Sequence, residues 1–158
     1  MPDPIVTLTR CDDYSRPAIA EAIERHFDLL GGLEKFVRPG DSVLIKPNFI
    51  APRSRRHATQ TDPAVILETA RLLKDFGARP FVADSPAWAN TYACAKALKL
   101  DESLKQLSVP IRQLDKPKKC QIGAKNILVG ISSVALDANV IINLPKFKSH
   151  QQLAATFA

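Results

Sequence analysis

Polar side chains that suit anion binding and proton transfer follow directly after apolar, β-branched runs in this sequence. The last such run spans residues 140–144 and ends at Pro145. It is followed by Lys146, Lys148 and His150. Because β-branched runs suit buried strands and proline cannot donate to a sheet ladder, these side chains follow the end of a strand. Lysine can hold an anion, and histidine titrates near neutral pH, so the pattern predicts an anion site with an acid–base group.

Two earlier stretches have the same form. Lys46 and Asn48 follow one apolar run, and Asp84 and Ser85 follow another. In open parallel sheets the carboxyl ends of the strands meet at one edge, where α/β proteins bind ligands. We therefore expect these side chains to share a site with Asn143, the polar residue inside the last run.

Two helix starts are expected at the same edge of the sheet. Asp62 and Ser85 each precede a proline, which is the order typical of an N-cap residue followed by the first helical position. Helix N-termini favour anions because their N–H groups and dipole carry partial positive charge. Each of these candidates also has a purely structural explanation. Asp62 and Ser85 are explained by helix capping, Lys46 by a charge at a strand end, and His150 by a surface position.

The residues of the expected site divide into two roles. The ligand-binding candidates are Lys46, Asn48, Asp62, Ser85, Asn143, Lys146 and Lys148, and the catalytic candidates are Asp84 and His150. Asp84 and His150 are expected to orient the ligand or move protons. Asp84 has two alternative roles, namely to orient a lysine or to bind a cation together with His150.

Alternating strands and helices are expected to position these residues. Apolar residues at helical spacing predict helices over residues 16–36, with an end or a break at Gly31-Gly32, and over residues 63–76, 87–98, 101–107 and 133–137. Strands are predicted over residues 5–8, 42–45, 80–83, 109–114 and 139–143, with one or two more within 120–129. This order predicts an α/β fold with a mostly parallel, open, Rossmann-like sheet and helices on both faces. The length fits a single domain over residues 1–158.

Composition narrows the class of protein. Hydrophobic residues make up 46% and charged residues 24% of the chain, which is typical of soluble globular proteins. We expect a cytoplasmic protein that does not interact with membranes, because we find neither a signal peptide nor an apolar run of about 18 residues. The net charge of +6 favours a basic face or a small anionic ligand. Nucleic acid is disfavoured because no helix-turn-helix or zinc-finger pattern is present.

Known cofactor motifs are missing from the sequence. Cys11, Cys94 and Cys120 are scattered, so we expect structural thiols, no metal site, and no iron–sulfur cluster built from this chain's own cysteines. Phosphate-loop, dinucleotide-binding, nucleophile-elbow and zincin motifs are absent, which gives those classes no support. The cofactor and the reaction therefore stay open.

Four short motifs in order resemble the domain of unknown function 362. They are Leu-Ile-Lys-Pro-Asn at 44–48, Thr-Asp-Pro at 61–63, Asp-Ser-Pro at 84–86 and Ile-Asn-Leu-Pro-Lys-Phe-Lys-Ser-His at 142–150. The resemblance implies an association with redox or iron–sulfur proteins, since some members carry a ferredoxin-like cysteine cluster outside this domain. Members of that family continue beyond the last motif into a longer carboxyl half. We therefore expect this chain to be the amino-terminal part of a longer domain whose other half completes the site.

Two hypotheses for the function follow. The first is an α/β domain that binds a small anionic ligand at the carboxyl ends of its strands. The second is a non-catalytic interaction module that pairs with a missing half, another copy of the chain or a redox partner. Whether the protein is an enzyme is left open by the residues.

Overall fold

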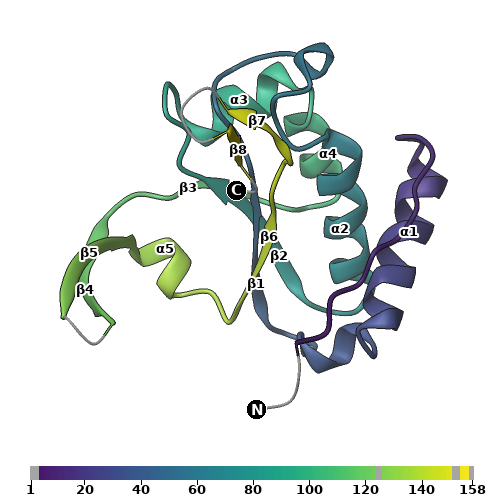
Figure 1. Cartoon of the computed structure of the whole chain (residues 1–158), viewed down its shortest axis with the longest axis horizontal. Coiled ribbons are helices and arrows are strands. Elements are labelled where there is room, and N and C mark those ends of the chain that lie inside the picture. The colour runs from purple at the N-terminus through teal and green to yellow at the C-terminus, as the bar shows by residue number, and fades with distance from the viewer. Residues whose placement is uncertain (1–3, 124–125, 151–153, 157–158) are drawn as a thin grey trace.

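A four-stranded parallel sheet forms the centre of the protein in the computed structural model, which describes residues 4–123, 126–150 and 154–156 (Figure 1). The strand order is β3-β2-β1-β6. The bounds are β1 Ser42–Pro47, β2 Arg79–Asp84, β3 Ile111–Gln113 and β6 Val140–Leu144. The predicted α/β fold with a parallel sheet is confirmed.

Helices cover the two faces of the sheet unequally. The α-helices are α1 Arg16–Leu29, α2 Pro63–Asp75, α3 Thr91–Ala97, α4 Asp101–Gln106 and α5 Ser133–Leu136, and the 3₁₀ turns are η1 Leu33–Lys35 and η2 Arg55–His57. Figure 1 shows α1 and α2 on one side of the sheet and the single turn of α5 on the other. Among the described helices none is long and apolar enough to cross a membrane.

Two antiparallel hairpins complete the described structure. One consists of β4 Pro117–Ile122 and β5 Ile127–Ser132, and it lies beside α5 (Figure 1). The other consists of β7 Lys148–His150 and β8 Ala154–Thr156, and it follows the carboxyl end of β6. The second hairpin therefore carries part of the last sequence motif back over the edge where the expected site lies.

Strand alternation divides the core into two layers. Val43, Ile45 and Val82 point to the face that α2 covers, where Ile66 and Leu73 are fully buried. That layer is the larger hydrophobic core of the described residues. It anchors β1 and β2, whose carboxyl ends carry the expected site.

The other face of the sheet has a thinner cover. Leu44 pairs in register with Phe81 and with Ile141, so these three side chains share one face. Leu44 and Phe81 pack against Val134 and Ala135 around α5, whereas Ile141 on β6 remains 50% exposed. The edge strand β6 thus leaves part of its apolar side in contact with solvent.

Local sequence signals explain why α2 begins and ends where it does. The Asp62 side chain accepts a hydrogen bond from the Ala64 N–H at 2.9 Å, so its predicted role as an N-cap is confirmed. The helix ends at Asp75, and Gly77 follows with a φ of 91°. Glycine adopts this left-handed conformation without the steric cost of a Cβ atom.

Two local predictions are wrong. Residues 5–8 form no strand, and Val6 is 83% exposed there, because their apolar run is short and has no described strand beside it. Ser85 does not cap a helix: α3 begins at Thr91, and the Asn90 side chain accepts the Ala93 N–H at 2.8 Å. A Ser-Pro pair suits a turn as well as a helix start, and here the stronger cap lies five residues later.

Candidate functional site

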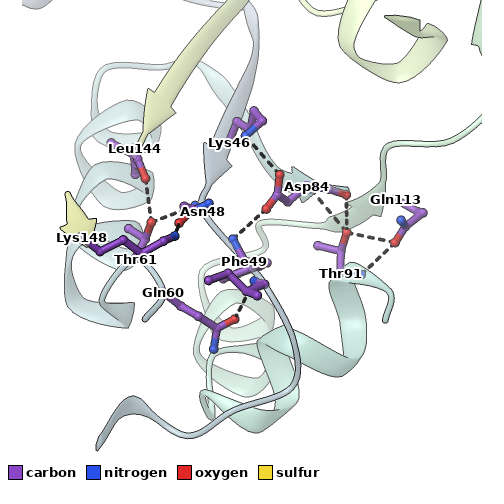
Figure 2. Close-up of polar contacts among 11 residues, drawn as sticks. Lys46, Asn48, Phe49, Gln60, Thr61, Asp84, Thr91, Gln113, Leu144 and Lys148 are labelled. Carbon is purple, nitrogen blue, oxygen red and sulfur yellow. Dashed lines mark hydrogen bonds and ion pairs between the residues drawn. The ribbon is translucent and has the colours of Figure 1, made fainter. Parts of the chain in front are cut away.

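A buried carboxylate, Asp84, lies at the carboxyl end of β2 (Figure 2). Its side chain is about 5% exposed and lies 3.2 Å from the Lys46 Nζ. The other carboxylate oxygen accepts a hydrogen bond from the Phe49 N–H at 2.7 Å. A buried charge is tolerated when it is paired and hydrogen-bonded, and both conditions hold here. Asp84 thereby ties the end of β2 to the end of β1 and the loop that follows it.

The backbone of Asp84 is held from the other side by α3 and β3. The Thr91 hydroxyl oxygen lies 2.8 Å from the Asp84 carbonyl oxygen and 3.0 Å from Gln113 Oε1. Gln113 Oε1 also accepts the Thr91 N–H at 2.8 Å. Since Thr91 is fully buried, these contacts hold the Asp84 backbone, from which the carboxylate extends, at the end of β2.

A chain of hydrogen bonds continues from β1 to the last sequence motif (Figure 2). The Asn48 N–H donates to the Thr61 hydroxyl at 2.8 Å, and that hydroxyl donates to the Leu144 carbonyl oxygen at 2.6 Å. The Lys148 Nζ donates to Asn48 Oδ1. The chain joins three segments far apart in the sequence at one edge of the sheet.

We call these five residues the Asp84 cluster: Lys46, Asn48, Thr61, Asp84 and Lys148. Partial burial lowers the pKa of Lys148 below its ordinary value, the charge of Asp84 raises it, and the neighbouring charge of Lys146 lowers it again. Burial is the largest of these effects, because it removes water from the charged ammonium group. Lys148 therefore gives up its proton more readily than a fully solvated lysine.

A pocket of about 430 Å³ lies beside the cluster, at the start of α2. Arg55, Arg56 and Lys146 line it, together with Asp62 and Thr61. An adjoining pocket of about 220 Å³ is lined by Asn143 and also by Lys146. We call the larger one the cationic pocket, since its described lining holds three cations and one carboxylate.

Tyr14 from the segment before α1 lies between the cations of the cationic pocket. The Arg55 guanidinium carbon is 5.6 Å and the Lys146 Nζ 5.7 Å from the centre of its ring. Lys146 also donates a hydrogen bond to the Tyr14 hydroxyl at 3.3 Å, and the Arg55 Nε donates to the Asp62 carboxylate at 2.6 Å. These contacts hold Lys146 and Arg55 in defined positions at the pocket.

The structure divides the predicted site into parts. Lys46, Asn48, Asp84 and Lys148 belong to the Asp84 cluster, whereas Asp62, Asn143 and Lys146 line the two adjoining pockets. Ser85 is exposed and lines a separate pocket of about 430 Å³ on the open face, together with Lys46. His150 ends β7, but its side chain lies outside the described part of the structure.

Several residues of the site are absent from the sequence-based prediction. Thr61 belongs to one of the four motifs, and its position next to Asp62 was the signal that could have identified it as a site residue. Arg55 and Arg56 lie in a basic segment whose apolar residues show neither helical nor strand spacing, so it gave no sign of a site. Tyr14 had no signal at all, because only the fold brings it to Lys146.

The three thiols lie in different surroundings. Cys11 is exposed, Cys120 on β4 is partly exposed, and Cys94 on α3 is buried. Burial raises the pKa of Cys94, and the charge of Asp84 adds to that effect. Within residues 4–123, 126–150 and 154–156, no three His, Cys, Asp or Glu side chains are grouped so that they could hold a metal ion.

Comparison with known proteins identifies the family. Residues 43–158 match the family model described as domain of unknown function (DUF362). The chain belongs to the DUF362 family. It is also 33% identical over 151 residues to the thylakoid-associated protein sll1697 of Synechocystis sp. (strain ATCC 27184 / PCC 6803 / Kazusa).

This DUF362 chain matches one part of that relative. The alignment covers 96% of the chain and 47% of the Synechocystis protein, so the chain spans about half the length of the curated relative. No solved structure matches the chain.

Proposed function

We propose that this DUF362 domain binds a small anionic ligand at the carboxyl ends of its strands, with the anion in the cationic pocket. One observation carries the proposal: Arg55, Arg56 and Lys146, from two distant parts of the sequence, line a single pocket. Arginine forms paired hydrogen bonds with phosphate or carboxylate oxygens, and lysine adds a point charge.

Charge balance supports an anionic ligand. Three cations and the single carboxylate of Asp62 leave an excess of two positive charges in the described lining of the pocket. The pocket also lies beside the N-terminus of α2, whose dipole favours negative charge. An anion bound there offsets the repulsion among the three cations.

The Asp84 cluster holds in place the residues that lie next to the cationic pocket. Thr61 belongs to both groups, since it bonds Asn48 and Leu144 while it lines the cationic pocket. In this proposal the cluster fixes the end of β6, from which Lys146 extends.

The proton-transfer roles of Asp84 and His150 stay predictions, as do the link to redox or iron–sulfur proteins and the cytoplasmic location. The Synechocystis relative is described as thylakoid-associated.

Titration calorimetry with inorganic phosphate tests this proposal. We expect the double variant Arg56→Ala/Lys146→Ala to bind phosphate about 100-fold more weakly than the wild type, at roughly tenfold per lost charge. The matched control is Arg25→Ala/Lys96→Ala, which removes two exposed cations from α1 and α3. Equal affinities in the two double variants, or no phosphate binding by the wild type, would contradict the proposal.

A second candidate function is a docking surface for another polypeptide along β6. This strand lies at the edge of the parallel sheet, contains no charged residue, and pairs on its outer side with no described strand. Ile141 is 50% exposed on the same strand. Uncharged edge strands recruit further strands, so a second copy or a complementary chain fits this edge.

Sedimentation velocity over a range of protein concentrations tests the docking surface. The expected result is association of the wild type and a monomeric Ile141→Lys variant, since a lysine on an edge strand opposes pairing. Asn143→Lys is a second variant on the same strand face. A wild type that stays monomeric at every concentration, alone and with the other half of the Synechocystis protein, would rule this candidate out.

A further inference from the structure

We infer that the cationic pocket takes a phosphorylated organic molecule whose ring or apolar body lies against Tyr14. This inference rests on the proposed function and names its class of ligand. The described lining of the pocket carries an excess of two positive charges. A phosphate monoester matches this excess, because it carries about 1.5 to 2 negative charges at neutral pH. The phosphate is expected to meet Arg56 and Lys146.

The size of the pocket favours an organic ligand over a bare ion. Small-molecule sites usually have volumes of roughly 300–1,000 Å³ and are lined mainly by apolar groups with a few polar ones. The cationic pocket has about 430 Å³ and is lined by Tyr14, Pro63 and Leu98 in addition to its charged residues. It therefore offers an apolar wall that an inorganic oxyanion does not use.

Tyr14 is the residue of that wall best placed to contact a ring. It is 47% exposed, and its hydroxyl accepts a hydrogen bond from Lys146. The contact fixes the tyrosine while leaving part of the ring accessible. Ring pairs in offset or edge-to-face geometry strengthen binding by roughly two- to tenfold beyond the effect of the buried area.

Thr59 provides an independent observation in the same pocket. Its hydroxyl oxygen is buried, and in the described part of the chain it has no hydrogen-bond partner. Thr59 also lines the cationic pocket. A buried hydroxyl without a partner is costly, and a turn of the Thr59 side chain toward the pocket lets a polar group of the ligand remove that cost.

The test compares phenyl phosphate with inorganic phosphate by titration calorimetry. We expect the wild type to bind phenyl phosphate at least about tenfold more tightly, and Tyr14→Ala to lose that preference. Tyr14→Phe keeps the ring and removes the hydroxyl, so it is expected to keep the preference. It also shows that a loss in Tyr14→Ala does not come from the lost hydrogen bond between Lys146 and the Tyr14 hydroxyl.

The outcomes separate this inference from the proposed function. Equal affinities of the wild type for the two probes overturn the inference while leaving anion binding in place. A preference that survives in Tyr14→Ala overturns it too, because the ring then contacts another part of the protein. Failure of both probes to bind overturns the proposed function itself.

Discussion

The Asp84 cluster and the cationic pocket lie side by side at the carboxyl edge of the sheet and differ in how their charges are balanced. In the cluster a buried carboxylate meets Lys46 and the Phe49 N–H, and Lys148 bonds Asn48. In the pocket three cations share one carboxylate, and solvent reaches them. Satisfied polar networks make a structure rigid, whereas unbalanced charge next to a cavity attracts a ligand. We therefore expect changes in the cluster to reduce stability and changes in the pocket to reduce binding.

Asp84→Ala tests the cluster with the largest expected effect. The change leaves the Phe49 N–H without its acceptor and Lys46 without its counter-charge. We expect a loss of about 3 kcal/mol in the free energy of unfolding, measured by urea denaturation. The partial exposure of Lys46 keeps the loss at the lower end of the range for buried pairs. Asp115→Ala, at an exposed carboxylate, is the control. A loss no larger than that of the control would mean that the cluster does not stabilise the fold.

Thr61→Val tests the residue that both regions share. Valine has the shape of threonine but cannot accept from the Asn48 N–H or donate to the Leu144 carbonyl oxygen. Two lost hydrogen bonds predict a decrease of about 2 kcal/mol in unfolding free energy. The expected loss of phosphate affinity is smaller than that of the pocket variants. Thr69→Val on α2 is the control, because its hydroxyl bonds only within its own helix.

Lys146→Ala tests the pocket alone. Loss of one cation predicts about tenfold weaker phosphate binding, which corresponds to about 1.4 kcal/mol. Its unfolding free energy is expected to stay within about 0.5 kcal/mol of the wild type, since the side chain is only partly buried. A stability loss as large as that of Asp84→Ala would place Lys146 in the structural cluster instead. Calorimetry and urea denaturation on the same protein sample measure both quantities.

Lys148 gives the smallest expected effect, a dependence of stability on pH. Its pKa is lowered in the folded protein, so the folded state releases the proton at a lower pH than the unfolded state. In the window from that lowered pKa up to the ordinary value of 10.5, the unfolded state binds more protons and stability rises with pH. We expect the stability of the wild type to rise relative to Lys148→Met across this window. A parallel pH dependence in the two proteins would contradict the assignment, and Lys105→Met on α4 is the control.

The sequence predicted the central sheet well because its strands are short apolar runs with distinct ends. The runs that became β1, β2 and β6 each stop at a polar residue or a proline, and α2 carries its own start and stop in Asp62 and Gly77. Residues 5–8 have the same apolar character but no described partner strand, so local pattern alone was misleading there. Ser85 failed for a related reason, because a Ser-Pro pair fits both a turn and a helix start.

The site was predictable where it lies at strand ends and at the start of α2. Parallel topology brings Lys46, Asn48 and Asp84 to one edge, and that placement follows from the strand order. The cationic pocket depends on an irregular loop with Arg55 and on Tyr14 before the first helix. Neither lies at a strand end, and their proximity to Lys146 comes from tertiary packing.

The separation of roles between the two regions is tested most directly by urea denaturation of Arg56→Ala/Lys146→Ala with and without phosphate. A ligand that binds only the folded state raises the unfolding free energy, by about 2.7 kcal/mol at a concentration 100 times its dissociation constant. We predict wild-type stability for this variant without phosphate, and little or no increase with phosphate at a concentration that stabilises the wild type by that amount. A variant that is already destabilised without phosphate, or that gains as much as the wild type, would contradict this division of roles.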